Sequence, residues 1–248
     1  MPNSRSPQST NETVISELPV VTEHYDISDI NAGLVIVDEV NGFATVGAGP
    51  LAPAEPNEQV ERMIHETDRL AQRFADQHRA IAVFLDTHEP GKPEPPYPPH
   101  CETGTGQEDL VPPLKWLEDC PQATLLRKDC INGFVGAIDV VSNKNRFVAW
   151  VLENNLKTII VTGICTDICV MDFVLTALSA RNHGLLPGVS DIVVLEPACA
   201  TYDLPLAKAK ALGLPETAAH PQAIAHHAGL YFMASRGAII GSEIISQN

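Results

Sequence analysis

Hydrophobic positions along the chain follow two alternating rhythms. Leu34–Val40 is a compact apolar run that contains two acidic residues near its end. The segment Asn57–His78 then carries apolar residues every three or four positions. A short continuous run is typical of a buried strand, and a three-to-four spacing is typical of a helix with one face in the core. The chain therefore begins as a strand followed by a helix.

The same alternation continues to the C-terminus. Further strands are predicted at Ala80–Asp86, Ala123–Arg127, Thr158–Thr162, Asp191–Leu195 and Ala238–Ile245, and further helices at Arg146–Asn155, Ile168–Arg181 and Pro215–Tyr231. Short apolar strands separated by helices predict a mostly parallel sheet covered on both faces. The fold class is therefore α/β, with three α/β/α layers around a central parallel sheet.

Two stretches depart from this rhythm. Residues 1–16 are polar and predict a flexible N-terminal tail, which leaves 17–248 as a single domain. The segment Glu89–Pro113 contains eight prolines and is too long for an ordinary connection. We expect it to be a functional loop.

Composition narrows the classes of function. The 248 residues are 44% apolar, carry a net charge of −15 and contain no basic cluster, which disfavours nucleic acid and anionic membranes as partners. No apolar run is long enough to span a bilayer, and the N-terminus lacks a secretory signal pattern. Six cysteines in a chain of this size fit a reducing compartment. These features predict a cytoplasmic protein.

Chemically active side chains stand at the ends of successive predicted strands. Asp38 ends the first strand, Lys128 the third, and Cys169 follows the fourth. Each has an ordinary reading alone: a capping acid, a solvated charge and a small buried hydrophobe. Because ligands and catalysis gather at the carboxyl ends of parallel strands, their coincidence at one edge indicates an active site.

Cys169 is the candidate nucleophile. It lies where a buried strand passes into a helix, in the heptapeptide Gly163–Cys169. The positive end of a helix favours a thiolate, so we expect this position to lower the pKa of the thiol.

A second group of residues could hold a metal ion. Asp86 and His88 are two positions apart on a predicted strand, so their side chains project to the same side. His100 would return from the proline-rich loop as a third ligand. Two histidines and a carboxylate suit zinc, iron or manganese, although histidines also serve as hydrogen-bonded loop anchors.

The motifs VDEVNGF around Asp38, LRKDCINGF around Lys128 and GICTDICV around Cys169 resemble those of the isochorismatase-like cysteine hydrolases, and within them the plant-type nicotinamidases. The resemblance runs from about Glu17 to Ile245 and implies an isochorismatase-like fold. It implies that Cys169 attacks an amide carbonyl, that Asp38 is the general base and acid, and that Lys128 favours their ionised forms.

Further details follow from the same resemblance. The backbone N–H groups of Cys165 and Cys169 would form the oxyanion hole, and a cis peptide would precede Cys165. One divalent metal of undetermined identity would be held by Asp86, His88 and His100. Many relatives have another histidine where this chain has Glu94, so the role of Glu94 and the coordination number stay open.

The resemblance also implies a substrate and an assembly. The small molecule nicotinamide would bind with its pyridine nitrogen on the metal and its ring between Phe43 and Tyr97; the alternative for these two residues is ordinary packing. A homo-oligomer is expected. Asn41 and Asp167 are assigned no chemistry, and His220, His226 and His227 are interpreted as surface or packing residues of a late helix.

Several functions compete. The leading one is hydrolysis of nicotinamide to nicotinate and ammonia, in NAD salvage. A close alternative is a related amidase acting on another small amide, of the N-carbamoylsarcosine or ureidoacrylate type, which generally lacks the metal triad and aromatic clamp. An iron oxygenase that uses Asp86, His88 and His100 would normally require an antiparallel β-barrel. A catalytically inactive binding module is disfavoured by the intact Asp38, Lys128 and Cys169.

Overall fold

The structure is a computed structural model that describes residues 15–92 and 94–246. Residues 1–14 of the predicted tail lie outside the described ranges. A seven-stranded sheet forms the centre, in the order β1-β9-β8-β7-β2-β3-β4, and every pair of neighbouring strands is parallel. The strands are β1 (Thr22–Asp26), β2 (Ala32–Val37), β3 (Ile81–Asp86), β4 (Ala123–Lys128), β7 (Thr158–Ile164), β8 (Asp191–Ala200) and β9 (Ile239–Ile245).

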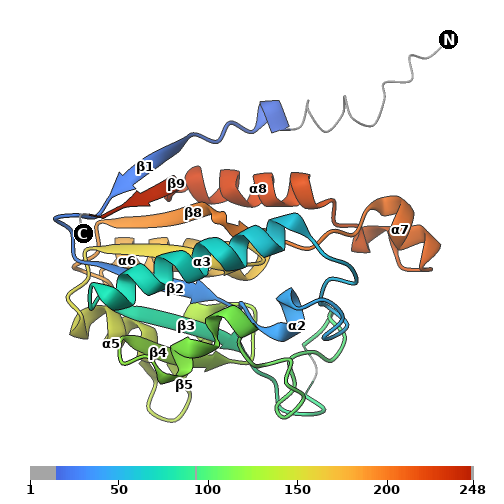
Figure 1. Ribbon diagram of the computed structural model, residues 1–248, viewed down its shortest axis with the longest axis horizontal. Coiled ribbons are helices and arrows are strands. Elements are labelled where there is room, and N and C mark those ends of the chain that lie inside the picture. Colours follow the sequence, from blue (N-terminus) through green and yellow to red (C-terminus); the bar gives the residue numbers. More distant parts are fainter. Residues whose placement is uncertain (1–14, 93, 247–248) are drawn as a thin grey trace.

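Helices cover both faces of the sheet (Figure 1). The longer ones are α3 (Glu58–Asp76), α5 (Arg146–Glu153), α6 (Met171–His183) and α8 (Gln222–Ala234). Shorter elements are α2 (Asn41–Ala44), the 3₁₀ turns η1 (Pro112–Asp119) and η3 (Glu216–Ala218), α4 (Gly133–Gly136), the π-helical turn η2 (Thr166–Val170), α7 (Leu206–Ala211) and a hairpin of β5 (Ile138–Asp139) and β6 (Lys144–Asn145). The three-layer α/β/α architecture is confirmed. No helix in the described ranges has the length and apolarity needed to cross a membrane.

Strand β2 shows how the sequence produces these layers. All six of its residues are buried, because successive side chains point to opposite faces and both faces are covered. Val35 and Val37 belong to the core on the side of α5, α6 and α8, whereas Leu34 and Ile36 belong to the core on the side of α3. A uniformly apolar run is therefore the correct signature of this strand.

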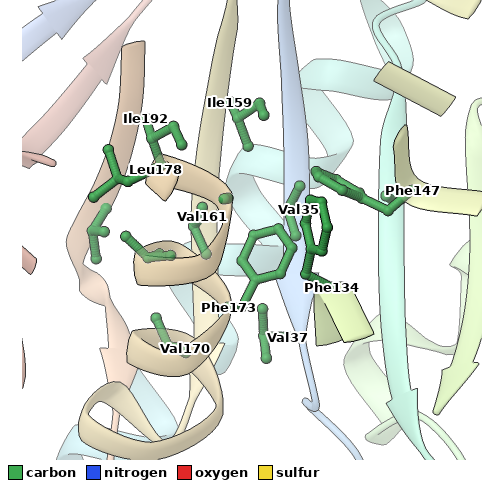
Figure 2. Packing of buried hydrophobic residues seen from close by; sticks show 14 of the residues in the cluster. Val35, Val37, Phe134, Phe147, Ile159, Val161, Val170, Phe173, Leu178 and Ile192 are labelled. Carbon is green, nitrogen blue, oxygen red and sulfur yellow. The ribbon is translucent and has the colours of Figure 1, made fainter. Parts of the chain in front are cut away.

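The core on the α6 side reaches the segment that carries the candidate nucleophile. Phe173 of α6 packs with Phe84 and Phe147 at ring-centroid distances of 5.2 and 5.1 Å. Figure 2 shows Val170, the last residue of η2, in the same cluster. The η2 turn, which precedes α6, is thus packed against this hydrophobic core through Val170.

The sheet order places the predicted site residues on neighbouring strands. Strands β2, β3 and β4 run from the middle of the sheet to one edge, whereas β7, β8 and β9 lie on the other side of β2. The order therefore reverses between β2 and β7, and such a switch point is where open α/β sheets bind ligands. A parallel sheet flanked by helices also contradicts the barrel that the oxygenase alternative requires.

Several predicted elements differ in detail. Strand β1 was missed, because it is an exposed edge strand without an apolar run. The expected helix Ile168–Arg181 is a π-helical turn followed by α6, and the expected helix Pro215–Tyr231 is η3 followed by α8. Both differences lie at helix starts near the carboxyl edge of the sheet.

Candidate active site

Asp38 is the first residue after β2 and has no exposed surface. Its φ of 55° lies in the left-handed region, which is uncommon for a residue with a side chain. Its N–H donates to the Phe84 carbonyl of β3 at 3.1 Å, and its own carbonyl accepts from Val40 at 2.7 Å. The chain is thus turned sharply at the strand end, and such outliers are often found at functional sites.

Lys128 lies between two carboxylates. Its Nζ is 2.8 Å from Asp38 Oδ2 and 2.9 Å from Asp86 Oδ1, and it donates to the Cys130 carbonyl at 2.9 Å. Asp86 and Lys128 are directly paired residues of β3 and β4, which explains why their side chains meet. A Cβ on Gly136 would come within 2.5 Å of Lys128 Cβ, so only glycine fits beside the lysine.

The surroundings push the pKa values of the two carboxyl groups apart. Burial raises the pKa of Asp38 to about 6, against the opposing charge of Lys128. Burial would also raise the pKa of Asp86, but Lys128 and its hydrogen bonds with His100 and His88 hold it well below its ordinary value. Burial would lower the pKa of Lys128, but Asp38, Cys169 and Asp86 raise it. At neutral pH the group therefore contains two carboxylates and one ammonium, and Asp38 is the carboxylate that can take up a proton.

Cys169 lies in the π-helical turn between β7 and α6, and is 8% exposed. The carbonyl of Cys165 accepts from the N–H groups of Ile168 and Val170 at 3.0 and 3.1 Å, which closes the turn. The peptide between Ile164 and Cys165 is cis, as predicted. Isolated π-turns of this kind are frequent at functional sites.

The expectation of a lowered thiol pKa is wrong. Burial raises the pKa of Cys169 well above its ordinary value; Lys128 opposes this shift, and Asp38 adds to it. The physical reason is that the cysteine lies inside the turn, next to an ionised carboxyl group, and not at the solvated start of α6. Cys169 in turn lowers the pKa of Asp38, which places the thiol next to this carboxylate. The resting nucleophile is a neutral thiol beside a base.

The predicted metal ligands converge. Asp86 Oδ2 lies 3.1 Å from His88 Nε2 and 3.2 Å from His100 Nε2, and the three ligand atoms lie within 4.8 Å of one another. All three side chains are buried. His100 returns to this place because His88 donates its N–H to the Cys101 carbonyl at 3.0 Å.

This donor set fits a divalent metal ion. His100 Nδ1 lies 2.8 Å from the Pro98 carbonyl, which can only accept, so Nδ1 carries a proton and donates it. A metal ion could then take the place of a proton on Nε2, which faces Asp86 Oδ2. Metal-binding histidines are commonly oriented by such a second hydrogen bond.

Glu94 lies beside this group. Its Oε2 is 3.7 Å from His88 Nε2 and 3.6 Å from His100 Nε2, while its Oε1 accepts from the Ile131 N–H at 2.8 Å. One oxygen is therefore used by the backbone, and the other faces the two imidazoles. The geometry allows Oε2 to act as a fourth ligand or to hydrogen-bond to one.

Both predicted aromatic residues border His100. The ring of Phe43, in α2, lies 5.6 Å from the His100 ring, and the ring of Tyr97 lies 6.0 Å from it. Burial and the nearby ionisable groups Cys169 and Cys165 raise the pKa of Tyr97, which indicates that it also faces the nucleophile turn. Both rings thus lie next to the metal group, and Tyr97 also lies near the turn that contains Cys169.

Residues without a predicted role also contact the nucleophile turn. Asp167 Oδ2 lies 2.8 Å from His220 Nε2, and Thr166 Oγ1 lies 2.8 Å from His226 Nδ1. His220 precedes α8 and is not part of a late helix, contrary to the expectation. Both histidines also do more than pack, because they contact the turn that contains Cys169. His227, whose Nε2 contacts the Leu18 carbonyl at 2.7 Å, fits the packing interpretation.

No local sequence signal identifies these contacts. His220 is 53 residues from Asp167 along the chain, and His226 is 60 residues from Thr166. The available hint is that Asp167 lies two positions before the nucleophile. The sequence could therefore suggest a cation near Asp167, but it could not identify which residue supplies that cation.

Comparisons with known proteins relate the chain to one family and one fold. A family model described as the isochorismatase domain matches residues 32–225. Nicotinamidase 1 of Arabidopsis thaliana is 54% identical over 216 residues, which cover 87% of each chain. A nicotinamidase structure from Bacillus subtilis covers 86% of this chain and 100% of its own, with a TM-score of 0.62 and 21% identity. A zinc complex of pyrazinamidase from Pyrococcus horikoshii covers 88% and 99%, with a TM-score of 0.56 and 19% identity.

Proposed function

We propose that this chain, which belongs to the isochorismatase domain family, hydrolyses nicotinamide to nicotinate and ammonia. The observation that carries the proposal is the position of Asp86, whose Oδ1 contacts Lys128 while its Oδ2 contacts the imidazoles of His88 and His100. One buried carboxylate thereby joins a cysteine amidase centre to a group that could hold a metal. The 54% identity to a plant nicotinamidase supports the same activity.

The acylation step starts from a neutral thiol. Asp38 accepts the proton of Cys169 while the sulfur bonds to the amide carbonyl carbon, and the π electrons of the carbonyl move onto its oxygen. Backbone N–H groups of Cys165 and Cys169 would donate to this oxyanion; each such donor typically contributes about 10²–10³ in rate. When the carbon–nitrogen bond breaks, Asp38 returns the proton to the leaving nitrogen. Ammonia departs and a thioester remains.

Deacylation uses the same base. Asp38 takes a proton from a water molecule as its oxygen bonds to the thioester carbon. The carbon–sulfur bond then breaks, Cys169 recovers the proton from Asp38, and the acid leaves and ionises to nicotinate. Lys128 stabilises the ionised form of Asp38 at the start of each step. Acid–base catalysis of this kind is typically worth about 10²–10⁴ in rate.

Orientation of the substrate comes from the other side of the site. A divalent ion held by Asp86, His88 and His100, with Glu94 beside them, would supply an electrophilic anchor for the pyridine nitrogen. Phe43 and Tyr97 border this position and would hold the flat ring by stacking. Zinc, iron and manganese all suit such ligands.

An alternative small amide is less well supported. The resemblance implies that amidases of the N-carbamoylsarcosine and ureidoacrylate type generally lack the metal triad and the aromatic clamp. In this structure the Asp86, His88 and His100 group is assembled and bordered by two rings. These features favour a heteroaromatic amide.

The cellular setting is part of the proposal. We infer a cytoplasmic enzyme that returns nicotinamide to NAD synthesis and acts as a homo-oligomer, without nucleic acid or membrane partners. All six cysteines are free thiols, as expected of a reducing compartment.

Ammonia release from nicotinamide tests the proposal. Wild-type protein is expected to release ammonia, and Cys169→Ala is expected to release none above background. Cys120→Ala is the matched control, because the Cys120 thiol contacts Gln122 outside the site. No release by the wild type would refute the nicotinamidase assignment, and full release by Cys169→Ala would refute the nucleophile.

A further inference from the structure

A half-buried cluster around Asp167, beside the nucleophile turn, has no role in the chemistry above. Asp167, two residues before Cys169, accepts from Thr201 Oγ1 at 2.7 Å through Oδ1 and lies 2.8 Å from His220 Nε2 through Oδ2. The ring of His220 stacks on Tyr202, with centroids 3.8 Å apart and planes 14° apart. These residues come from three elements that are distant in sequence.

The hydrogen bonds determine the charge of His220. Its Nδ1 lies 2.8 Å from the Tyr202 carbonyl, and its Nε2 lies 2.8 Å from the Asp167 carboxylate. Neither partner can donate, so both ring nitrogens must carry protons. Asp167 and Tyr202 are the titratable groups that contact His220 in the described part of the chain. His220 is therefore an imidazolium that pairs with one carboxylate and lies on an aromatic face.

The cluster joins two parts of the molecule. His220 exchanges two backbone hydrogen bonds with Leu204, at 2.7 and 2.8 Å, which closes the segment that contains α7 and η3 into a loop. Asp167 belongs to η2 and is approached closely by α8, where a Cβ on Gly229 would come within 2.8 Å of Asp167 Cα. The ion pair thus fastens the 202–220 loop to the turn that contains the nucleophile.

Tyr202 extends this arrangement toward the substrate. Burial raises the pKa of Tyr202 to about 12, and the neighbouring ionisable groups Cys165, Tyr97 and Asp167 add to the shift. Tyr202 therefore lies near Cys165, a proposed oxyanion donor, and near Tyr97, a proposed ring contact. Through Tyr202, the 202–220 loop therefore comes close to both the nucleophile turn and the proline-rich loop that carries Tyr97.

We propose that His220 is a positioning residue for amide hydrolysis, which holds the nucleophile turn through its ion pair with Asp167 and holds Tyr202 by stacking on its ring. This inference rests on the proposed function. As pH rises and His220 loses a proton, Nε2 presents a lone pair to the Asp167 carboxylate. The contact then becomes repulsive and the turn is released, so activity should fall on the alkaline side.

Kinetics of three variants test this role. His220→Ala is expected to lower kcat/KM for nicotinamide by about ten- to a hundredfold, because small displacements of reacting groups have effects of this size. The loss should fall mainly on kcat, and the alkaline limb assigned to His220 should disappear. His220→Gln keeps an N–H that can donate to Asp167 and should recover part of the loss. His227→Ala, seven residues further along in α8, should behave as the wild type.

Wild-type kcat/KM in His220→Ala with an unchanged alkaline limb would overturn the proposal. Because this variant could also fold poorly, NMR titration of the His220 imidazole provides a second measurement. His220 should be protonated at neutral pH, and Asp167→Asn should lower its pKa. A neutral His220 at neutral pH overturns the inference whether or not the wild type hydrolyses nicotinamide, so failure of this inference is distinguishable from failure of the proposed function.

Discussion

His100 and His220 make similar hydrogen bonds and differ in which other groups lie around them. In each, Nδ1 lies 2.8 Å from a backbone carbonyl, and Nε2 faces a carboxylate oxygen, at 3.2 Å from Asp86 and at 2.8 Å from Asp167. Around His100, however, a second imidazole and Glu94 also converge. Around His220 there is a single carboxylate and a stacked tyrosine ring.

The number of converging donors decides what each histidine can do. Three or four ligand atoms around one point can bind a metal ion in place of a proton. A single carboxylate beside one imidazole is not enough to bind a metal ion. His220 therefore keeps its proton and forms an ion pair with Asp167. Two imidazoles with the same local hydrogen bonds thus contribute to the same site in different ways, one toward the substrate and one toward the protein backbone.

The largest expected effect comes from removing the imidazole of His100. His100→Ala should lose most of its bound metal, and its kcat/KM should fall by about a hundredfold or more, because the substrate ring would no longer be oriented. His220→Ala should keep its metal. Metal content after gel filtration, measured by mass spectrometry, checks both. Wild-type metal content in His100→Ala would show that His100 is not a ligand.

A smaller effect is expected from Glu94→Gln. The amide oxygen of Gln can still accept from the Ile131 N–H, so the loop should stay in place while the charge near the two imidazoles is lost. Affinity for the metal should fall by about tenfold, as for other groups that support metal ligands. Competition with a fluorescent chelator measures it. An unchanged affinity for the metal would mean that Glu94 contributes only its hydrogen bond with the Ile131 N–H.

The His220 pair should contribute to folding in a pH-dependent way. Burial would lower the pKa of His220, but Asp167 raises it, so its contribution is fully present below the pKa of an unfolded histidine and is lost as pH rises through the folded value. Burial would raise the pKa of Asp167, but His220 and Thr201 lower it, so its contribution is lost at acidic pH. His220→Ala should therefore cost about 1–3 kcal/mol near neutral pH and less in alkaline solution. Urea unfolding at several pH values measures this, and a constant cost would contradict an ion pair.

The smallest effect is expected from His227→Ala. This side chain has one contact with the Leu18 carbonyl, so its loss should cost about 0.5–1.5 kcal/mol and leave kcat/KM unchanged. Steady-state kinetics and urea unfolding check it. A fall in activity comparable to that of His220→Ala would mean that α8 supports the site as a whole, and not through His220.

The two regions also differ in how well the sequence predicts them. Asp38, Asp86 and Lys128 each end an apolar strand, and parallel strands bring their ends together, so local pattern is enough to assemble them. His100 reaches the site through a single loop, and the contact that brings it beside His88 joins residues only twelve to thirteen positions apart in the sequence. His220 needs the packing of α8 against η2, which depends on residues more than fifty positions apart.

The charge state of the Cys169 thiol could also not be predicted from the sequence. The strand–helix junction indicates a helix start, where a thiolate is favoured. The structure has a π-helical turn there, and burial beside Asp38 reverses the sign of the pKa shift. Solvent exposure of one side chain cannot be read from a seven-residue motif.

The central claim is that a neutral Cys169 thiol is activated by the carboxylate of Asp38. The pH dependence of kcat/KM for nicotinamide tests it most directly. Because the pKa of Asp38 is raised to about 6, kcat/KM should rise from acid solution with a midpoint near that value, and should fall only on the alkaline side, where His220 loses its proton. A rate that stays low at neutral pH and climbs only where a thiol ionises would mean that Cys169 reacts without Asp38, and would contradict the account.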